Sequence, residues 1–140
     1  MQIKIKDKEK VVFNAPGNVA EIFQKILATE NEIDRDKEHF WAVGINANNT
    51  IKYIELVSLG TLESSLVHSR ETFRFAISKA ASRIVVAHNH PSGTLAPSEE
   101  DIKITKRLVD AGDIIGIKVL DHVIVTKGGF TSLKEQGYII

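Results

Sequence analysis

The sequence predicts an α/β domain of three layers, in which helices cover both faces of a mixed central sheet. Its 140 residues fit one domain, residues 1–140, and are enough to bury a core. Two strand-like segments come first and predict an antiparallel pair, after which helical and strand-like segments alternate. The short run Ile84–Ala87 is apolar throughout, which is typical of a strand covered on both faces.

The N-terminal part is predicted to begin with a small hairpin, because residues 3–6 and 10–13 flank a polar turn. A helix is expected next. Asn18, with Glu21 three residues later, is a start signal for that helix. The apolar residues that follow recur at helical spacing, and they are Val19, Ile22, Phe23, Ile26 and Leu27. The polar stretch 30–37 predicts a loop.

The antiparallel pair is predicted from two apolar runs joined by turn residues. The run His39–Asn46 predicts a buried strand, and Ile51–Ser58 predicts the strand that returns beside it. Asparagine dominates the connection 46–49, as is typical of tight turns. Residues 60–68 are expected to form a loop or a short strand.

Helix and strand patterns then begin to alternate. Ser69 is a suitable cap for a helix over residues 71–81. The apolar face of that helix is predicted to consist of Phe73, Ala76, Ile77 and Ala80. The buried strand 84–87 follows, and residues 88–97, which are rich in proline, glycine and serine, predict a loop.

The last third continues the alternation. Residues 98–111 predict a helix that ends at Gly112. Residues 117–126 have a strand pattern with a bend expected near Asp121-His122. A glycine turn follows at 127–129, and the tail 130–140 is expected to hold one short helical turn.

Composition excludes several classes of protein. There is no cysteine, so a disulfide scaffold, a thiolate zinc finger and a cysteine nucleophile are all excluded. Lysine plus arginine number 18 and aspartate plus glutamate 18, so the basic excess usual in nucleic-acid-binding domains is absent. The N-terminus has no continuous apolar run, and no stretch approaches the ~20 apolar residues that span a bilayer. A cytoplasmic protein without a membrane partner is therefore expected, and the zero net charge disfavours a nucleic-acid partner without excluding one.

The most informative residues follow the buried strand. His88 and His90 are two positions apart, a spacing that places both side chains on one face of an extended chain. Pro91 restricts His90 to extended backbone geometry. Asp101 is predicted to lie in the first turn of the next helix, where the helix dipole favours a carboxylate. Two imidazoles and one carboxylate that converge in this way are suited to bind Zn²⁺ and leave one tetrahedral position open, the arrangement of catalytic rather than structural zinc.

Two plainer interpretations of these residues stay open. Ser98 and Asp101 match the capping box [ST]-x-x-[DE], so Asp101 could serve the helix alone. His122 lies within an apolar strand pattern. A buried, hydrogen-bonded histidine is the favoured interpretation there, and a role behind the metal ligands is the alternative.

The spaced residues His88, His90, Pro91, Ser98 and Asp101 resemble the JAMM motif of MPN-type metallopeptidases. The stretch 85–101, followed by Val119-Leu120-Asp121-His122, is similar to the RadC-like bacterial branch of that family, and the resemblance covers roughly residues 15–140. It implies an MPN fold related to the cytidine deaminases, with zinc held by His88, His90 and Asp101. RadC-like proteins commonly carry an N-terminal helix-hairpin-helix region, for which this chain has no room.

The resemblance also implies two catalytic residues. An upstream glutamate would act as the general base, and Glu38, just before the strand at 39–46, is the candidate, with Glu32, Glu55 and Glu63 as rivals. Ser98 would stabilise the oxyanion of the tetrahedral intermediate.

A zinc-dependent metallopeptidase or isopeptidase acting on a peptide or protein substrate is therefore the expected function. The alternatives are a non-catalytic MPN binding module and a RadC-type protein associated with DNA repair.

Overall fold

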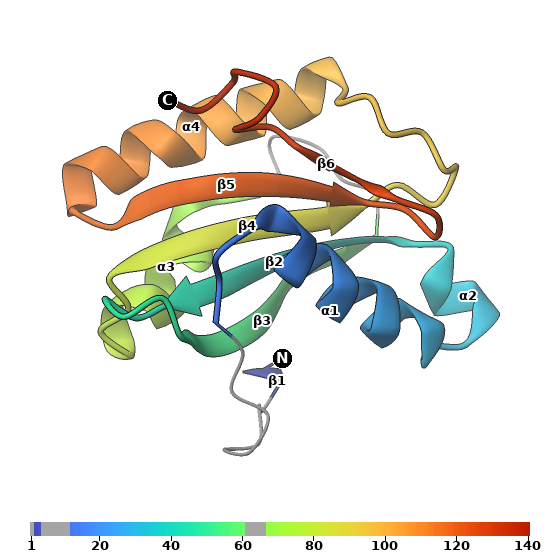
Figure 1. Cartoon of the computed structure of the whole chain (residues 1–140), viewed down its shortest axis with the longest axis horizontal. Helices are drawn as coiled ribbons and strands as arrows, with labels where there is room; N and C mark the ends of the chain where they lie inside the picture. The colour runs from blue at the N-terminus through green and yellow to red at the C-terminus, as the bar shows by residue number, and fades with distance from the viewer. Residues whose placement is uncertain (1, 4–11, 61–66) are drawn as a thin grey trace.

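A mixed sheet of six strands forms the centre of the computed structural model, which describes residues 2–3, 12–60 and 67–140 (Figure 1). The strands are β1 (Gln2–Ile3), β2 (Glu38–Ile45), β3 (Ile51–Gly60), β4 (Arg83–Asn89), β5 (Lys118–Val125) and β6 (Phe130–Ser132). Their order across the sheet is β1-β3-β2-β4-β5-β6. β4 and β5 run parallel, and the other neighbouring pairs are antiparallel. The predicted mixed sheet and the antiparallel pair β2–β3 are confirmed.

Helices cover both faces of this sheet. They are α1 (Pro16–Ala28), α2 (Glu32–Arg35), α3 (Ser69–Ser78) and α4 (Glu99–Ile115). One buried cluster joins α3 and α4 to the sheet through Phe73, Ile104 and Leu108, together with Phe40 of β2. The second cluster joins α1 to the opposite face through Val19 and Phe23. The three-layer α/β prediction is therefore confirmed.

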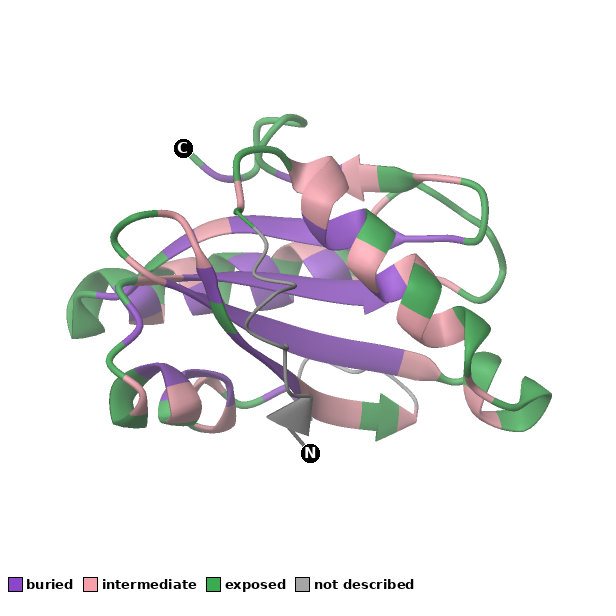
Figure 2. Cartoon of the chain, turned by 60° about the horizontal axis from the view of Figure 1, so that its bottom comes forward, coloured by how far each residue is buried: buried purple, intermediate pink, exposed green. Residues whose placement is uncertain are grey.

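Alternation along β2 explains why its sequence is apolar without interruption. Phe40 and Ala42 belong to the cluster under α3 and α4, whereas Trp41 and Val43 belong to the cluster under α1. Both sets are almost fully buried, and the central strands appear as continuous buried ribbons in Figure 2. A strand covered on both faces needs apolar residues at every position rather than at every second one.

A β-bulge interrupts the parallel pair β4–β5. Ile84 pairs with Val119 and Val85 pairs with Asp121, so Leu120 is an extra residue in β5. Beyond the bulge, His122 pairs with Val86, whose side chain belongs to the cluster under α3 and α4. His122 therefore faces α4, and the bend predicted near Asp121-His122 corresponds to this bulge.

Two predictions near the N-terminal helix were wrong. α1 begins at Pro16 rather than Asn18, and the Asn18 side chain instead accepts hydrogen bonds from the backbone N–H groups of Asn14 and Ala15, each at 3.0 Å. The stretch 30–37, predicted as a loop, contains the single-turn helix α2. Asn31 caps α2 by accepting a hydrogen bond from the Asp34 N–H at 2.8 Å.

The ends of the two later helices also differ from the predictions. α3 ends at Ser78, so Ala80 lies outside it, and Ile77 is 60% exposed rather than part of the core. α4 continues past Gly112 to Ile115 and is capped by Gly116 in the left-handed conformation. Gly112 is needed for close packing instead, because an added Cβ would lie 2.4 Å from the carbonyl oxygen of Ile117.

The tail adds a strand that the sequence did not predict. β6 pairs antiparallel with β5, and the following turn has Gln136 N–H donating to Ser132 O at 3.1 Å. The hairpin predicted over 3–6 and 10–13 lies largely outside the described residues, as does most of the segment 60–68. Within the described part of the chain, no helix is both long and apolar enough to cross a bilayer.

Candidate metal centre

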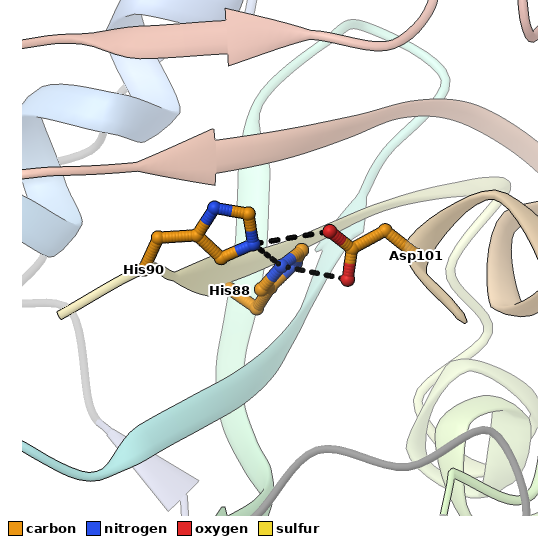
Figure 3. A group of neighbouring side chains, drawn as sticks. All are labelled: His88, His90 and Asp101. Atoms are coloured by element: carbon orange, nitrogen blue, oxygen red, sulfur yellow. Dashed lines mark hydrogen bonds and ion pairs between the residues drawn. The ribbon is translucent and has the colours of Figure 1, made fainter. Parts of the chain in front are cut away.

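Three side chains converge where β4 ends and α4 begins (Figure 3). His88 lies in β4, His90 follows the strand directly, and Asp101 lies in the first turn of α4. The Nε2 atoms of His88 and His90 are 2.9 Å apart. Asp101 Oδ1 lies 3.1 Å from His88 Nε2, and Asp101 Oδ2 lies 3.0 Å from His90 Nε2. The structure thus brings together the three residues that the spacing singled out.

The donor set fits a divalent metal ion. Each residue can offer one ligand atom, and these atoms all lie within 4.8 Å of one another. Zinc ligands lie about 2.0–2.2 Å from the ion, so two of them can be at most about 4.4 Å apart. The three distances between the ligand atoms, 2.9, 3.1 and 3.0 Å, fall below that limit, and two imidazoles with one carboxylate are ligands that zinc accepts.

Asp101 serves both the helix and the cluster. Ser98 is the N-cap of α4, where its Oγ accepts a hydrogen bond from Asp101 N–H at 3.1 Å and its own N–H donates to Asp101 Oδ2 at 2.8 Å. Burial disfavours the charged form of Asp101, but the adjacent imidazoles of His88 and His90 outweigh burial and hold the pKa of Asp101 far below its usual range. The carboxylate is therefore ionised, and its capping and clustering roles coexist.

The loop after β4 orients the second histidine. His90 Nδ1 lies 2.7 Å from the carbonyl oxygen of Thr94, which can only accept a hydrogen bond. In neutral His90 the proton is consequently on Nδ1, and Nε2 presents its lone pair to the cluster. Gly93 adopts a φ of +86° and donates its N–H to His90 O at 3.0 Å, which closes the turn that brings Thr94 back. The hydrogen bond to Asp101 raises the pKa of His90, with Glu38 adding a smaller electrostatic contribution.

His122 lies directly behind His88. It is fully buried, and its Nε2 is 2.7 Å from His88 Nδ1, while its Nδ1 is within hydrogen-bond distance of Thr105 Oγ1. Burial, together with the neighbouring His88, lowers the pKa of His122 well below its usual value. His122 is therefore a neutral, hydrogen-bonded histidine, as favoured from the sequence, and it also touches a candidate ligand.

The cluster opens into a cleft that contains both predicted catalytic residues. Glu38, the first residue of β2, and Ser98 line this cleft with His90 and Asp101. The Ser98 hydroxyl accepts from Asp101 N–H, so its proton remains available as a donor. The structure therefore places Glu38 and Ser98 in the same cavity as two of the candidate ligands, His90 and Asp101, with His88 buried directly behind them.

The rival glutamates lie elsewhere or outside the described residues. Glu32, in α2, lines a neighbouring hollow. Glu55 is buried in β3, where burial raises its pKa, with Arg74 and Glu71 of α3 as its charged neighbours. Glu63 falls outside the described residues. Among the three candidates that the structure describes, Glu38 is the one that lines the cleft of the cluster.

Asn89 holds the start of β2 beside the cluster, a role that the sequence did not reveal. Its Oδ1 accepts from His39 N–H at 2.5 Å, and its Nδ2 donates to Lys37 O at 3.0 Å. These two bonds clamp the backbone on both sides of Glu38. The position of Asn89 between the two histidines indicates that it faces the opposite side of the strand, but nothing in the sequence identifies its partners, which lie about fifty positions away in the chain.

Comparison with known proteins agrees with this architecture. The family model described as the RadC-like JAB domain matches residues 13–138. A UPF0758 protein of Caldanaerobacter subterraneus subsp. tengcongensis is 57% identical over 102 residues, which are 73% of this chain and 44% of that protein. A UPF0758 protein of Desulforamulus reducens is 47% identical over 130 residues, 93% of this chain and 55% of that protein.

A third relative, from Listeria monocytogenes, is 41% identical over 134 residues, 96% of this chain and 58% of that UPF0758 protein. The chain thus spans about half the length of the curated relatives it matches. The match of the family model covers most of the chain and includes the cluster, the cleft and strands β2 to β6. This chain belongs to the RadC-like JAB domain family.

Proposed function

We propose that this domain is a zinc-dependent hydrolase that cleaves an amide bond, as a peptidase or isopeptidase, in a peptide or protein substrate. The observation that carries the proposal is the convergence of His88, His90 and Asp101 at a cleft whose lining includes His90, Asp101, Glu38 and Ser98. A JAB-family domain is compatible with such an activity.

The three converging residues would hold the ion. Zinc bound there supplies Lewis acidity, which polarises a carbonyl group and lowers the pKa of a water molecule to about 7. Three protein ligands leave one position for substrate or water, which is the arrangement of catalytic zinc sites.

The other two residues would handle the proton and the developing charge. Glu38 accepts a proton from the attacking water and passes it to the nitrogen of the leaving amine, because a carboxylate is a suitable general base and, once protonated, a suitable general acid. The Ser98 hydroxyl donates a hydrogen bond to the oxyanion of the tetrahedral intermediate. Donors in such positions are worth about 2.7–4 kcal/mol of transition-state stabilisation.

The shape of the cleft supports an extended substrate. The cleft continues past His90 and Pro91 into the neighbouring hollow, and both cavities share these two residues and Asp36. Leu27 and Ala28 of α1 supply an apolar wall there, with Arg35 of α2 nearby. A peptide chain, rather than a compact metabolite, would use both cavities at once.

Metal analysis and one conservative substitution test the proposal. The purified chain is expected to bind about one zinc ion, and His88→Ala to lose it. Glu38→Gln is expected to keep the zinc and to lose at least about 100-fold in turnover, because general base catalysis typically contributes 10²–10⁴-fold.

The probes are internally quenched peptide libraries and a lysine-ε-linked isopeptide, with Glu21→Gln as the matched control, because Glu21 is exposed on α1 and lines neither cavity. Absence of zinc from the wild-type chain, or normal turnover by Glu38→Gln, contradicts the proposal. Zinc binding without turnover of any probe would instead indicate a non-catalytic binding module.

A further inference from the structure

We propose that His122 and Thr105 form a hydrogen-bonded relay that fixes which ring nitrogen of His88 faces the metal centre, and that they tie His88 to the helix turn carrying Asp101. The inference rests on the proposed metal centre, and it assigns positioning roles to two residues that do not touch the ion or the substrate.

The relay is a chain of three contacts within the buried interior. His88 Nδ1 lies 2.7 Å from His122 Nε2. His122 Nδ1 lies against Thr105 Oγ1, and Thr105 Oγ1 lies 2.7 Å from the carbonyl oxygen of Asp101. Thr105, His122 and His88 are each at most 1% exposed, so water does not compete for these atoms. The relay therefore begins at one candidate ligand and ends at the backbone of another.

The donor and the acceptor in each contact of the relay follow from its last contact, between Thr105 Oγ1 and Asp101 O. The carbonyl oxygen of Asp101 has no proton, so the hydroxyl of Thr105 must be the donor in that contact. With its proton committed, Thr105 Oγ1 accepts from His122 Nδ1–H. Neutral His122 then has a lone pair on Nε2, which accepts from His88 Nδ1–H. The lone pair of His88 is consequently on Nε2, the atom that faces His90 and Asp101.

The opposite arrangement of protons breaks the buried hydrogen bond from Thr105 to Asp101 O, and it points His88 Nε2–H at Asp101 Oδ1, 3.1 Å away, where an ion would otherwise bind. If His122 Nε2 carried the proton, its Nδ1 would need the hydroxyl proton of Thr105, and the contact from Thr105 to Asp101 O would lose its donor. His88 would then carry its own proton on Nε2 and could not bind an ion there. Partners that fix the tautomer of a metal-binding histidine typically change metal affinity by 10–100-fold when they are removed.

Packing and strand geometry hold the rings of the relay in place. The ring of Phe40 packs edge-on against His122, with 5.8 Å between centroids, and lies 6.4 Å from the ring of His88. The bulge at Leu120 turns His122 toward α4, the helix that supplies Thr105 and Asp101. A histidine that only filled space in the core would not need a partner such as Thr105, whose hydroxyl already donates its proton to Asp101 O and can therefore only accept from His122.

The decisive variant is Thr105→Val, which keeps the shape of the side chain and removes the hydroxyl, with Thr105→Ser as the matched control that keeps it. Long-range ¹H–¹⁵N NMR of the metal-free protein reports the tautomer of each histidine. Wild type and Thr105→Ser are expected to show His88 and His122 protonated on Nδ1, and Thr105→Val to show a population protonated on Nε2. Zinc affinity, measured by competition with a chromophoric chelator, is expected to fall about 10–100-fold in Thr105→Val and by less than about threefold in Thr105→Ser.

The proposed relay is wrong if NMR shows His88 protonated on Nε2 in the metal-free wild-type protein. It is also wrong if Thr105→Val and Thr105→Ser bind zinc with equal affinity. The wild-type NMR measurement keeps the inference testable even if Thr105→Val does not fold. It also separates the two proposals. Absence of zinc binding by the wild type sinks the proposed hydrolase, whereas the tautomer of His88 in the metal-free protein decides the relay independently.

Discussion

Replacing Asn89 by alanine tests how the start of β2 is held beside the metal centre. Asn89 is 3% exposed, and its side chain bonds the backbone N–H of His39 and the carbonyl of Lys37. Alanine removes both bonds. The Lys37 carbonyl keeps one partner, because His39 Nδ1 donates to it at 2.9 Å, whereas the His39 N–H loses the side-chain oxygen that satisfies it.

The magnitude follows from that one orphaned donor. A buried N–H without a partner costs about 1–3 kcal/mol. For a chain of 140 residues this corresponds to a decrease in Tm of about 3–10 °C. The side chains of His88 and His90 lie on the other face of the chain, so Asn89→Ala is expected to bind zinc with unchanged stoichiometry. Turnover is expected to fall, because the backbone on both sides of Glu38 is no longer clamped.

Thermal unfolding of the metal-free protein measures the stability change without a contribution from bound metal. Asn48→Ala is the matched control, because Asn48 is exposed in the turn before β3 and bonds only its own turn, with Oδ1 accepting from Thr50 N–H at 3.2 Å. The control is expected to change stability by no more than about 0.5 kcal/mol. If Asn89→Ala unfolded within about 1 °C of the wild type, the two hydrogen bonds of Asn89 would not be what holds the start of β2.

Two further outcomes are expected. Gly112→Ala should lower the free energy of unfolding in urea by about 1–3 kcal/mol, because the new Cβ would lie 2.4 Å from Ile117 O. This cost exceeds the gain of about 1 kcal/mol that alanine brings to a helix. Asp113→Ala, at an exposed position of α4, is the control, and equal urea midpoints for the two variants would contradict the close packing of Gly112. Zinc affinity should decrease as pH falls, because a proton and the zinc ion compete for His90 Nε2. The hydrogen bond to Asp101 raises the pKa of His90 above 6.5, so the decrease in affinity begins above that pH. Below the raised pKa the decrease should approach about tenfold per pH unit in a chelator competition titration, and a flat profile would refute the assignment of His90 as a ligand.

The candidate ligands could be found from sequence because their geometry is local. The two-residue spacing in an extended chain is enough to place His88 and His90 on one face. The position of Asp101 follows from predicting where the next helix begins, because Asp101 lies in its first turn. Glu38 required the resemblance to a known family, because its position beside the cluster depends on the pairing of β2 with β4. Asn89 and Thr105 were missed for the same reason: their partners come from other elements, and one sequence does not show which elements are neighbours.

The elements that were predicted wrongly share a different cause. Glycine and asparagine are common at helix ends, so Gly112 was predicted to stop a helix and Asn18 to start one. Gly112 instead makes a close approach to Ile117 O across the fold, and the Asn18 side chain reaches back to accept from two backbone N–H groups just before α1. The strand β6 was missed because its three residues are too few to form a periodic pattern.

The bulge in β5 also determines where the strand can change in length. Leu120 is the residue without a position in the ladder, since Val119 pairs with Ile84 and Asp121 with Val85. Deleting Leu120 would straighten the strand and leave every other side chain of β5 on its present face. A deletion after the bulge would move all later residues to the opposite face. Insertions and deletions in β5 among related chains are therefore expected at Leu120. This residue separates the part of β5 that packs near the end of α4 from the part that places His122 beside His88.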